Sequence, residues 1–164
     1  YELVGDYSTL RIDPNQSWSL DYAKSATKAL EINNLPIEYL EQPLKRDQLA
    51  EHRELSLTTS IPLMADESCF SEGDLIKVIS SNAFKFLNVK ILKAGGVFPA
   101  RRLAQLAKES GLTVSIGLMM EGDQGVRAAT HLANEVSPEI IHDLDAAWWF
   151  KGSSIVYQGS TVRV

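Results

Sequence analysis

Short apolar runs recur along the chain, and a charged residue closes each of four successive runs. The four charged residues are Asp13, Glu41, Asp66 and Lys90. They stand about 25 residues apart, which is the length of one strand, one helix and two loops. A chain that repeats strand and helix in this way builds a parallel sheet, and functional residues gather at the carboxyl ends of its strands. The pattern therefore predicts an α/β fold with its chemistry at one edge of the sheet.

The same pattern predicts six strands and about five helices in strict alternation. Ser17 or Ser19 caps the first helix, and Ser71 with Asp74 opens the third in near capping-box form. Gly111 stands where a glycine ends a helix. The predicted strands are 9–13, 37–40, 63–65, 86–91, 113–117 and 140–142, with mixed β character in the tail 154–164. The predicted helices are 17–31, 47–55, 71–80, 99–110 and 124–134.

Side-chain alternation predicts which face of the sheet carries the charged residues. Residues two apart on a strand share a face, so Arg11 lies with Asp13 and Asn88 lies with Lys90. The residues between them are apolar and suit contact with helices. The second strand fits less cleanly, because its Glu38 falls on the helix-facing side.

Composition sets limits on size and partners. The 164 residues, 45% of them hydrophobic, are enough for one domain with a core, but a whole (β/α)₈ barrel needs about 250. The net charge is −5 and no basic run occurs, which argues against nucleic acid as a partner. No apolar stretch reaches the roughly 18 residues of a membrane span, and no signal peptide is evident. The chain begins at Tyr1 rather than Met, so we expect a truncated start.

Several residues of reactive or aromatic type are assigned structural roles. Cys69 is the single cysteine, which fits a reducing cytoplasm, and we interpret it as a small buried residue rather than a nucleophile. His52, His131 and His142 are scattered, so we expect structural rather than catalytic roles. The aromatic run 148–150 predicts packing in the core, under the missing half of the barrel.

The three strand-end acids predict a site for a hard divalent cation. Asp13, Glu41 and Asp66 offer only oxygen ligands, which select Mg²⁺ over zinc. One acid after a strand is more often a helix cap, but three at one period, with Lys90 on the next strand, favour a metal site. A lysine beside such a cation is a candidate base for proton transfer.

The residues around these four positions resemble the enolase superfamily. The motifs are Asp13-Pro14-Asn15, Glu41-Gln42-Pro43, Ala65-Asp66-Glu67-Ser68 and Asn88-Val89-Lys90-Ile91-Leu92-Lys93-Ala94-Gly95-Gly96. Their order and spacing are similar to those of the muconate-lactonizing subgroup, over about residues 10–150. The resemblance implies one partial (β/α)₈ barrel domain over residues 1–164, holding strands three to eight. The first two barrel strands and an N-terminal capping domain are absent from these residues.

The resemblance also implies roles for the charged residues. Three acids would bind Mg²⁺, and Lys90 would exchange the proton α to the substrate carboxylate. That proton is very weakly acidic, and its loss puts two negative charges on an enediolate. A divalent cation neutralises much of that charge, which is worth several kcal/mol. The supporting positions are Asn15 and Glu67, which would hold the ligands, and Lys93, which would add to the field or lie in solvent.

A further motif is similar to that of the dipeptide epimerases within the superfamily. In the segment His142-Asp143-Leu144-Asp145, the Asp-x-Asp pair would bind the ammonium group at the substrate's N-terminus. Asp143 and Asp145 share a face if the strand stays extended. The loop after the strand 113–117 resembles a substrate-facing loop. There Glu121 would orient the lysine or the substrate, and Met120 would contact the substrate or pack in the wall.

The chain departs from the superfamily pattern in one respect. Such enzymes carry a Lys-x-Lys motif on the second barrel strand, whose second lysine is the partner base, and these residues contain none. We therefore expect Mg²⁺-dependent dipeptide epimerisation from the complete protein and no activity from these residues alone. The alternatives are a cycloisomerase, an o-succinylbenzoate synthase, or an inactive barrel fragment that serves as an assembly partner. The expected partners are a dipeptide substrate and either a second copy of the chain or a complementing N-terminal portion.

Overall fold

The computed structural model describes residues 9–159 and 161–164. Two compact units make up the chain, residues 1–87 and residues 88–164. The sheet has the strand order β1-β2-β3-β4-β5, and the pairs β1–β2, β2–β3 and β3–β4 run parallel. The α/β class is therefore confirmed, whereas a single domain over residues 1–164 stays a prediction. The strands are β1 (Leu10–Ile12), β2 (Ile37–Glu41), β3 (Leu63–Ala65), β4 (Phe86–Lys90) and β5 (Thr113–Gly117).

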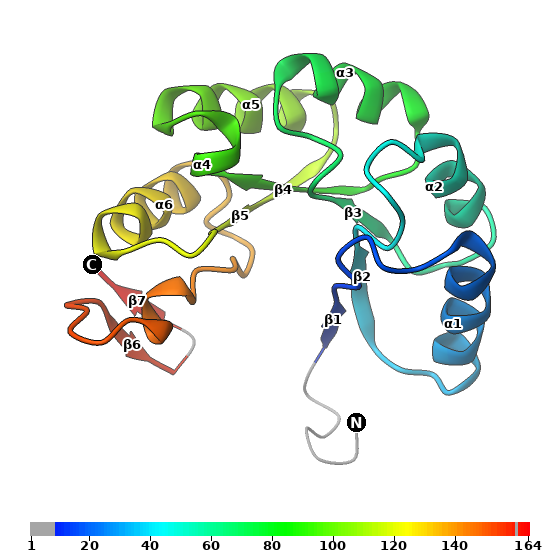
Figure 1. Ribbon diagram of the computed structural model, residues 1–164, viewed down its shortest axis with the longest axis horizontal. Helices are drawn as coiled ribbons and strands as arrows, with labels where there is room; N and C mark the ends of the chain where they lie inside the picture. Colours follow the sequence, from blue (N-terminus) through cyan, green and yellow to red (C-terminus); the bar gives the residue numbers. More distant parts are fainter. Residues whose placement is uncertain (1–8, 160) are drawn as a thin grey trace. The chain divides into compact units, whose positions relative to one another are not determined.

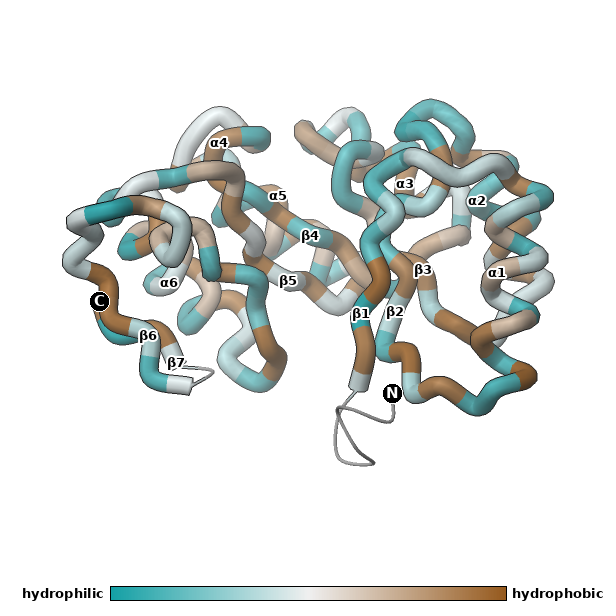
Figure 2. Tube along the Cα trace, turned by 60° about the horizontal axis from the view of Figure 1, so that its bottom comes forward, coloured by the Kyte–Doolittle hydropathy of each residue, from teal (hydrophilic) through white to brown (hydrophobic). Residues whose placement is uncertain are grey.

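In the first unit, one helix follows each of the first three strands. These helices, α1 (Leu20–Ile32), α2 (Leu49–Ser56) and α3 (Glu72–Ser81), cover one side of β1–β3 (Figure 1). The Ser19 side chain accepts a hydrogen bond from the backbone of Tyr22, and Ser71 accepts one from Asp74, so both predicted caps are confirmed. Hydropathy alternates along α1 and α2 (Figure 2), as helices with one buried face require.

Strand β3 lies at the centre of the first unit's core. Its three residues, Leu63, Met64 and Ala65, are at most 1% exposed, which is typical of a parallel strand between neighbours on both sides. The neighbouring strand β2 contributes the fully buried Leu40, and α2 contributes Leu55. This buried centre carries the ends of β2 and β3, where the candidate ligands Glu41 and Asp66 stand.

Glu38, whose position did not fit the alternating pattern of the second strand, forms an ion pair with Arg11. The pairing register of β1 against β2 shifts between Leu10 and Arg11. The Arg11 Nε atom donates to Glu38 Oε2 at 2.8 Å, and its guanidinium lies 4.9 Å from the centre of the Tyr39 ring. Glu38 is therefore held by a cation on the neighbouring strand, despite its position in the alternating pattern.

The second unit begins within β4 and contains a helix that the sequence pattern did not predict. Helix α4 (Ile91–Ala94) starts directly after Lys90, and α5 (Val97–Glu109) follows it. Gly95 and Gly96 join the two helices with φ angles of 88° and 130°, a left-handed conformation that favours glycine. The remaining helix, α6 (Asp123–Val136), follows β5.

The predicted strand at 140–142 is wrong. In the described part of this region, one isolated parallel bridge joins Gly117 to Asp143. The backbone N–H of Ile116 donates to the His142 side chain at Nδ1, at 3.0 Å, instead of to a backbone carbonyl. Asp145, with φ −90° and ψ −1°, then leaves the extended conformation and begins the short 3₁₀ helix η1 (Ala146–Trp149). Asp143 and Asp145 therefore do not belong to one extended strand.

The aromatic run at the end of η1 is exposed among the described residues, so its burial under the missing part of the barrel stays a prediction. Trp148, Trp149 and Phe150 are 67%, 70% and 41% exposed among the described residues. Trp148 stacks on Tyr157 with ring centres 5.0 Å apart. Tyr157 belongs to an antiparallel hairpin of β6 (Val156–Gln158) and β7 (Thr161–Arg163), which confirms the β character of the tail. In residues 9–159 and 161–164, no helix has both the length and the apolar character to cross a membrane.

Candidate metal and proton-transfer site

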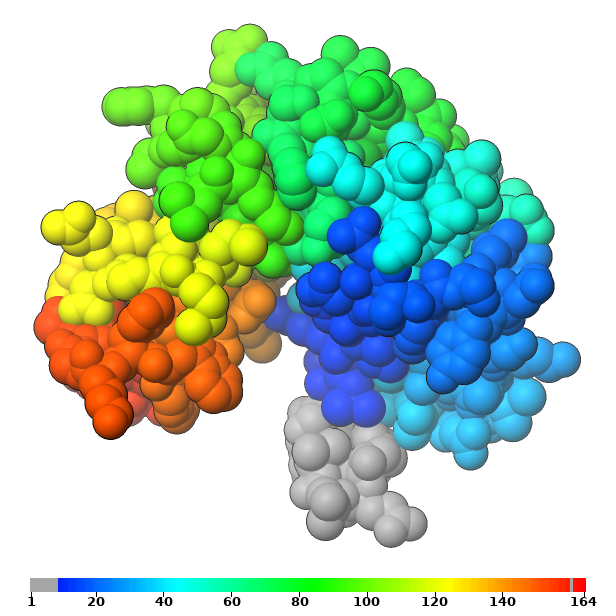
Figure 3. Space-filling view, in the orientation of Figure 1, coloured from blue at the N-terminus to red at the C-terminus, as the bar shows by residue number. Residues whose placement is uncertain are grey.

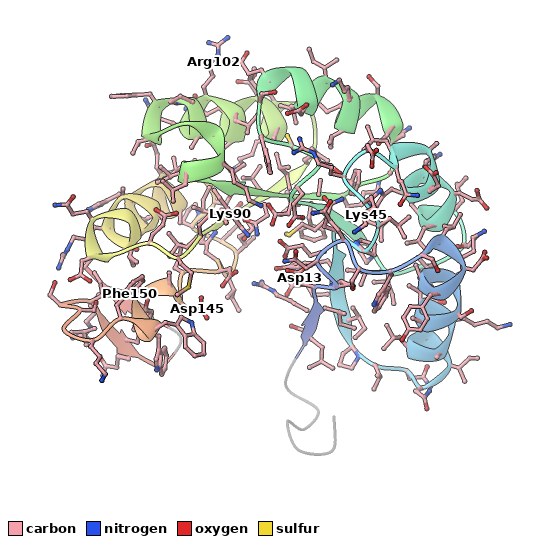
Figure 4. All side chains as sticks on the ribbon, in the orientation of Figure 1. Asp13, Lys45, Lys90, Arg102, Asp145 and Phe150 are labelled. Atoms are coloured by element: carbon pink, nitrogen blue, oxygen red, sulfur yellow. The ribbon has the colours of Figure 1, made fainter. Side chains whose placement is uncertain are left out.

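Three carboxylates stand at the same end of three neighbouring parallel strands. Asp13 follows β1 (Figure 4), Glu41 is the last residue of β2, and Asp66 follows β3. Asp13 is exposed, whereas Glu41 is 8% exposed and Asp66 only 1%. A buried carboxylate needs hydrogen bonds, a counter-charge or a metal ion to offset its lost hydration. The fold therefore brings the three predicted ligands to one edge of the sheet in the first unit.

The turn after β1 holds the Asp13 side chain. The backbone N–H of Asn15 donates to Asp13 Oδ1 at 2.8 Å. Asn15 and the next residue, Gln16, have φ angles of 50° and 63°, so the chain folds back tightly here. This contact is made by the backbone of Asn15, and the predicted role of Asn15 in holding a metal ligand stays a prediction. Glu67 is half-buried beside Asp66, and its supporting role stays a prediction.

The donor set fits magnesium in kind and in strand position. All three side chains are carboxylates, and no histidine or cysteine stands with them at the strand ends. As placed, no three His, Cys, Asp or Glu side chains in the described part of the chain are close enough to hold a metal ion. Shared ligation of one Mg²⁺ by Asp13, Glu41 and Asp66 therefore stays a prediction.

One residue that the sequence analysis did not assign lies among these ligands. Gln42 directly follows Glu41, is fully buried, and has a φ of 34°, a left-handed value that is uncommon for a non-glycine residue. Its side chain accepts a hydrogen bond from the Asp66 backbone N–H at 2.9 Å. Gln42 stood in the motif Glu41-Gln42-Pro43, but no local pattern in the sequence assigned it a role.

Lys90 ends β4 in the second unit. It is half-buried and directly precedes α4, which carries the half-buried Lys93 (Figure 4 labels Lys90). Asn88, on the same strand, is 2% exposed and packs against Gly117 of β5. A Cβ atom at Gly117 would lie 2.5 Å from Asn88 Oδ1, so only glycine leaves room for this amide. The proton-transfer role of Lys90 and the role of Lys93 stay predictions.

Glu121 is buried beneath the loop that follows β5. Its side chain is 7% exposed, and its Oε1 atom accepts a hydrogen bond from the Met119 N–H at 3.2 Å. A Cβ atom at Gly125 of α6 would overlap the Glu121 carboxylate, so this glycine makes room for it. Met120 is 67% exposed among the described residues, and its contact with the substrate or packing in a wall stays a prediction.

The Asp-x-Asp pair borders a cavity in the second unit. Asp143 and Asp145 are exposed and flank Leu144, which is 8% exposed. Together with Trp148 and Tyr157, they line a cavity of about 430 Å³ (Figure 4 labels Asp145). Carboxylates and aromatic faces are both favourable surroundings for a cationic group. The chemistry of this cavity suits an ammonium ligand, although the binding itself stays a prediction.

The structural roles predicted for Cys69, His52 and His142 are confirmed. Burial, with a smaller contribution from Asp74 and Asp66, raises the pKa of the Cys69 thiol to about 12, so it is not a thiolate at neutral pH. Burial likewise lowers the pKa of His52. His142 is held at both ring nitrogens, by the Ile116 N–H and by the Ser137 carbonyl at 2.9 Å.

Comparisons of this chain with known proteins agree on one family. A family model described as "Enolase C-terminal domain-like" matches residues 1–163. The L-Ala-D/L-Glu epimerase of Bacillus subtilis (strain 168) is 34% identical over 165 residues, which cover 98% of this chain and 45% of that protein. The N-succinyl-L-Arg/Lys racemase of Bacillus cereus is 32% identical, with coverage of 80% and 36%. The chain thus spans less than half the length of these relatives.

Solved structures give the same result. The substrate-liganded complex of the Bacillus subtilis L-Ala-D/L-Glu epimerase has a TM-score of 0.92 at 33% identity, covering 98% of this chain and 46% of that one. The dipeptide epimerase from Enterococcus faecalis V583, complexed with Mg and the dipeptide L-Leu-L-Tyr, has a TM-score of 0.85 at 33% identity, with coverage of 94% and 44%. The prediction of a partial barrel from the C-terminal part of such proteins is confirmed.

Proposed function

Because the chain belongs to the enolase C-terminal domain-like family, we propose that the complete protein is an isomerase that epimerises dipeptides with the help of Mg²⁺. The observation that carries this proposal is the placement of Asp13, Glu41 and Asp66 at the ends of three neighbouring parallel strands. The relatives support this substrate class, since several are named as dipeptide epimerases and two are solved with Mg and a dipeptide.

The three carboxylates are the proposed metal ligands. Asp13, Glu41 and Asp66 would hold one Mg²⁺ and leave positions for the substrate carboxylate or water. Bound there, the ion would supply positive charge that offsets the second negative charge of the substrate enediolate. Glu41 and Asp66 are buried at the ends of β2 and β3, where packing limits the positions that their carboxylates can take.

Lys90 is the proposed acid/base for one face of the substrate. Its neutral Nζ amine takes the proton from the α-carbon of the C-terminal residue and becomes an ammonium group. The electron pair of the broken C–H bond moves into the enediolate. Inversion requires a proton to return to the opposite face, so a second acid/base group must act there. Residues 1–164 contain no Lys-x-Lys motif that would correspond to that group.

Asp143 and Asp145 are proposed to select dipeptides by their charge. A dipeptide carries a free ammonium group at its N-terminus, and the two carboxylates border a cavity of about 430 Å³ beside Trp148 and Tyr157. N-succinylated amino acids and the substrates of cycloisomerases lack that ammonium group. The pair would therefore favour dipeptides over the substrates of the other branches.

The test compares a free dipeptide with its N-acetyl form in the complete protein. Loss of one charged hydrogen bond costs roughly 1.5–3 kcal/mol, or about ten- to two-hundredfold in kcat/KM. We expect Asp143→Asn and Asp145→Asn to reduce kcat/KM for the free dipeptide by that factor. The N-acetyl dipeptide should be a poor substrate already and should be much less affected.

Glu109→Gln is the matched control, because Glu109 is an exposed carboxylate of α5 in the same unit. It should leave both rates unchanged. Equal rates for the free and the acetylated dipeptide in the unaltered protein would exclude the ammonium interaction. The similarity to an N-succinyl-L-Arg/Lys racemase would then favour an N-acylated substrate as the second candidate. No turnover of any of these compounds would favour an assembly role.

A further inference from the structure

We propose that Gln42 is a positioning residue that fixes the three strand ends carrying Asp13, Glu41 and Asp66 relative to one another. This inference rests on the proposed metal site, since it assigns to Gln42 the task of holding that site's ligands in place. Gln42 does so by joining the loops that follow β1, β2 and β3, through both its side chain and its backbone carbonyl.

The side chain of Gln42 joins the end of β2 to the end of β3. Its Oε1 atom accepts two backbone hydrogen bonds, from Asp66 at 2.9 Å and from Ser68 at 3.0 Å. Its Nε2 atom donates to Ser68 Oγ at 2.8 Å and to the Leu44 carbonyl at 3.2 Å. The amide therefore holds Asp66 and Ser68, which follow β3, while the Gln42 backbone continues directly from Glu41 at the end of β2. A shift of Asp66 relative to Glu41 must break these bonds.

The backbone of the same segment joins the end of β1. The Gln42 carbonyl accepts a hydrogen bond from Gln16 at 2.7 Å, and the Pro43 carbonyl accepts one from Trp18 at 3.0 Å. In the opposite direction, the Gln16 side chain accepts a hydrogen bond from the Arg46 backbone N–H at 2.9 Å. Figure 3 shows the residues after β1, in dark blue, against the cyan residues after β2. The loop that carries Asp13 is thus fastened to the segment around Gln42.

The chemistry of a primary amide explains why glutamine stands here. The position is 0% exposed and must accept from two backbone N–H groups while it donates to a hydroxyl and a carbonyl. Only an amide offers both functions on one rigid group. His52 Nε2 lies 3.4 Å from Gln42 Nε2, and His52 Nδ1 donates to the Gln48 carbonyl. With that tautomer, His52 Nε2 is an acceptor beside the amide nitrogen, whose two hydrogens serve Ser68 and Leu44. A flip of the amide would place Oε1 against this second acceptor, so His52 opposes the flip.

The arrangement goes beyond what core packing requires. A buried side chain that served packing alone could be replaced by an apolar one of equal size. Gln42 also adopts the left-handed φ of 34°, which is costly for a residue with a side chain and is kept by its surroundings. This conformation directs its side chain to the β3 end and its carbonyl to the β1 loop. The ligands of a metal ion need such fixed supports, because small displacements weaken binding.

The experiment measures Mg²⁺ binding to the complete protein by isothermal titration, with Gln42→Met as the main variant. Methionine keeps the length and the burial but removes every side-chain hydrogen bond. Loss of a group that supports metal ligands typically costs about 10- to 100-fold in affinity, so Gln42→Met should weaken Mg²⁺ binding by that factor. Excess Mg²⁺ should restore its activity. Backbone amides of Asp66 and Ser68 should exchange with D₂O faster than in the unaltered protein, even without metal.

Val78→Ala is the matched control, because Val78 is 1% exposed in α3 and its loss destabilises the same unit. At an equal drop in melting temperature it should keep the original Mg²⁺ affinity. If Gln42→Met does not fold, Ser68→Ala removes one arm of the network and should show a smaller loss of affinity in the same direction.

The outcomes separate this inference from the proposed function. Unchanged Mg²⁺ affinity in Gln42→Met, with Asp66→Asn unable to bind, overturns the role of Gln42 and leaves the metal site standing. No Mg²⁺ binding by the unaltered protein overturns the metal site and the role of Gln42 together. Equal losses in Gln42→Met and Val78→Ala would also overturn the inference, because general destabilisation would then explain both.

Discussion

Individual buried polar side chains determine what this molecule can do chemically. Asp66 is 1% exposed and Glu41 is 8% exposed, although a carboxylate buried at that depth is costly without compensation. The sequence identified both residues because they end apolar runs at a regular interval. It did not identify Gln42, because a role that depends on bonds to Ser68, 26 residues away, has no local signal. Residue types and local partners such as Ser71 and Asp74 were thus predictable, whereas partners far apart in the sequence were not.

The first prediction at this scale concerns Asp66. Asp66→Asn keeps the size of the side chain and removes its charge, so Mg²⁺ should lose one anionic ligand. Loss of a group that only supports a metal ligand lowers metal affinity or activity by about 10- to 100-fold. Loss of a ligand itself should cost more, so turnover in the complete protein should fall by more than about 100-fold. Asp21→Asn, at an exposed position of α1, is the control and should leave Mg²⁺ titrations and turnover unchanged. Undiminished Mg²⁺ affinity in Asp66→Asn would remove this residue from the ligand set.

At the scale of elements, the five strands and the long helices followed from the sequence pattern. Long periodic segments with caps such as Ser71 leave little ambiguity. Helix α4 was not predicted, because its four residues, Ile91–Ala94, are too few to show a helical period of apolar positions. The strand predicted at 140–142 failed because the His142 side chain takes the Ile116 N–H. Whether a side chain will compete for a backbone donor is decided in three dimensions and not by apolar alternation.

A second prediction concerns the contact that fastens the tail to α6. Asp123 accepts hydrogen bonds from Ser153 Oγ at 2.5 Å and from the Ser154 N–H at 2.6 Å. Bonds from Ser153 and Ser154 lower the pKa of Asp123 from its ordinary value of 3.8 to about 2. Because the pKa is lower in the folded state, the stabilisation is complete above the unfolded value and is lost as pH falls from about 4 to about 2.

Amide hydrogen exchange of the tail is the measurement for this contact. The Ser154 amide should be protected at pH 5 and should lose that protection progressively as the pH approaches 2. In Asp123→Asn the protection should be weaker and should no longer depend on pH in this window. Gln124→Glu, a change at an exposed neighbour, controls for added charge at the start of α6. Protection of Ser154 that is independent of pH in the unaltered protein would show that Asp123 does not hold the tail.

At the scale of the whole molecule, the chain reproduces one part of a larger enzyme architecture. It matches the enolase C-terminal domain-like family over residues 1–163 and spans less than half the length of its relatives. The α/β class and the partial barrel were predictable, because strand-end motifs mark each β/α unit in order. Burial of Trp148 and Trp149 under the missing part of the barrel stays a prediction, because both are exposed among the described residues.

The central claim is that Lys90 moves a proton at the α-carbon of a dipeptide with the help of Mg²⁺. The most direct measurement follows a free dipeptide by proton NMR in D₂O with the complete protein. We expect Mg²⁺-dependent loss of the α-proton signal of the C-terminal residue, together with the appearance of the epimer. Lys90→Ala should abolish epimerisation and leave, at most, slow exchange from the one epimer whose proton faces the other base. Full epimerisation by Lys90→Ala, or α-proton exchange that persists after Mg²⁺ is removed by a chelator, would contradict the account.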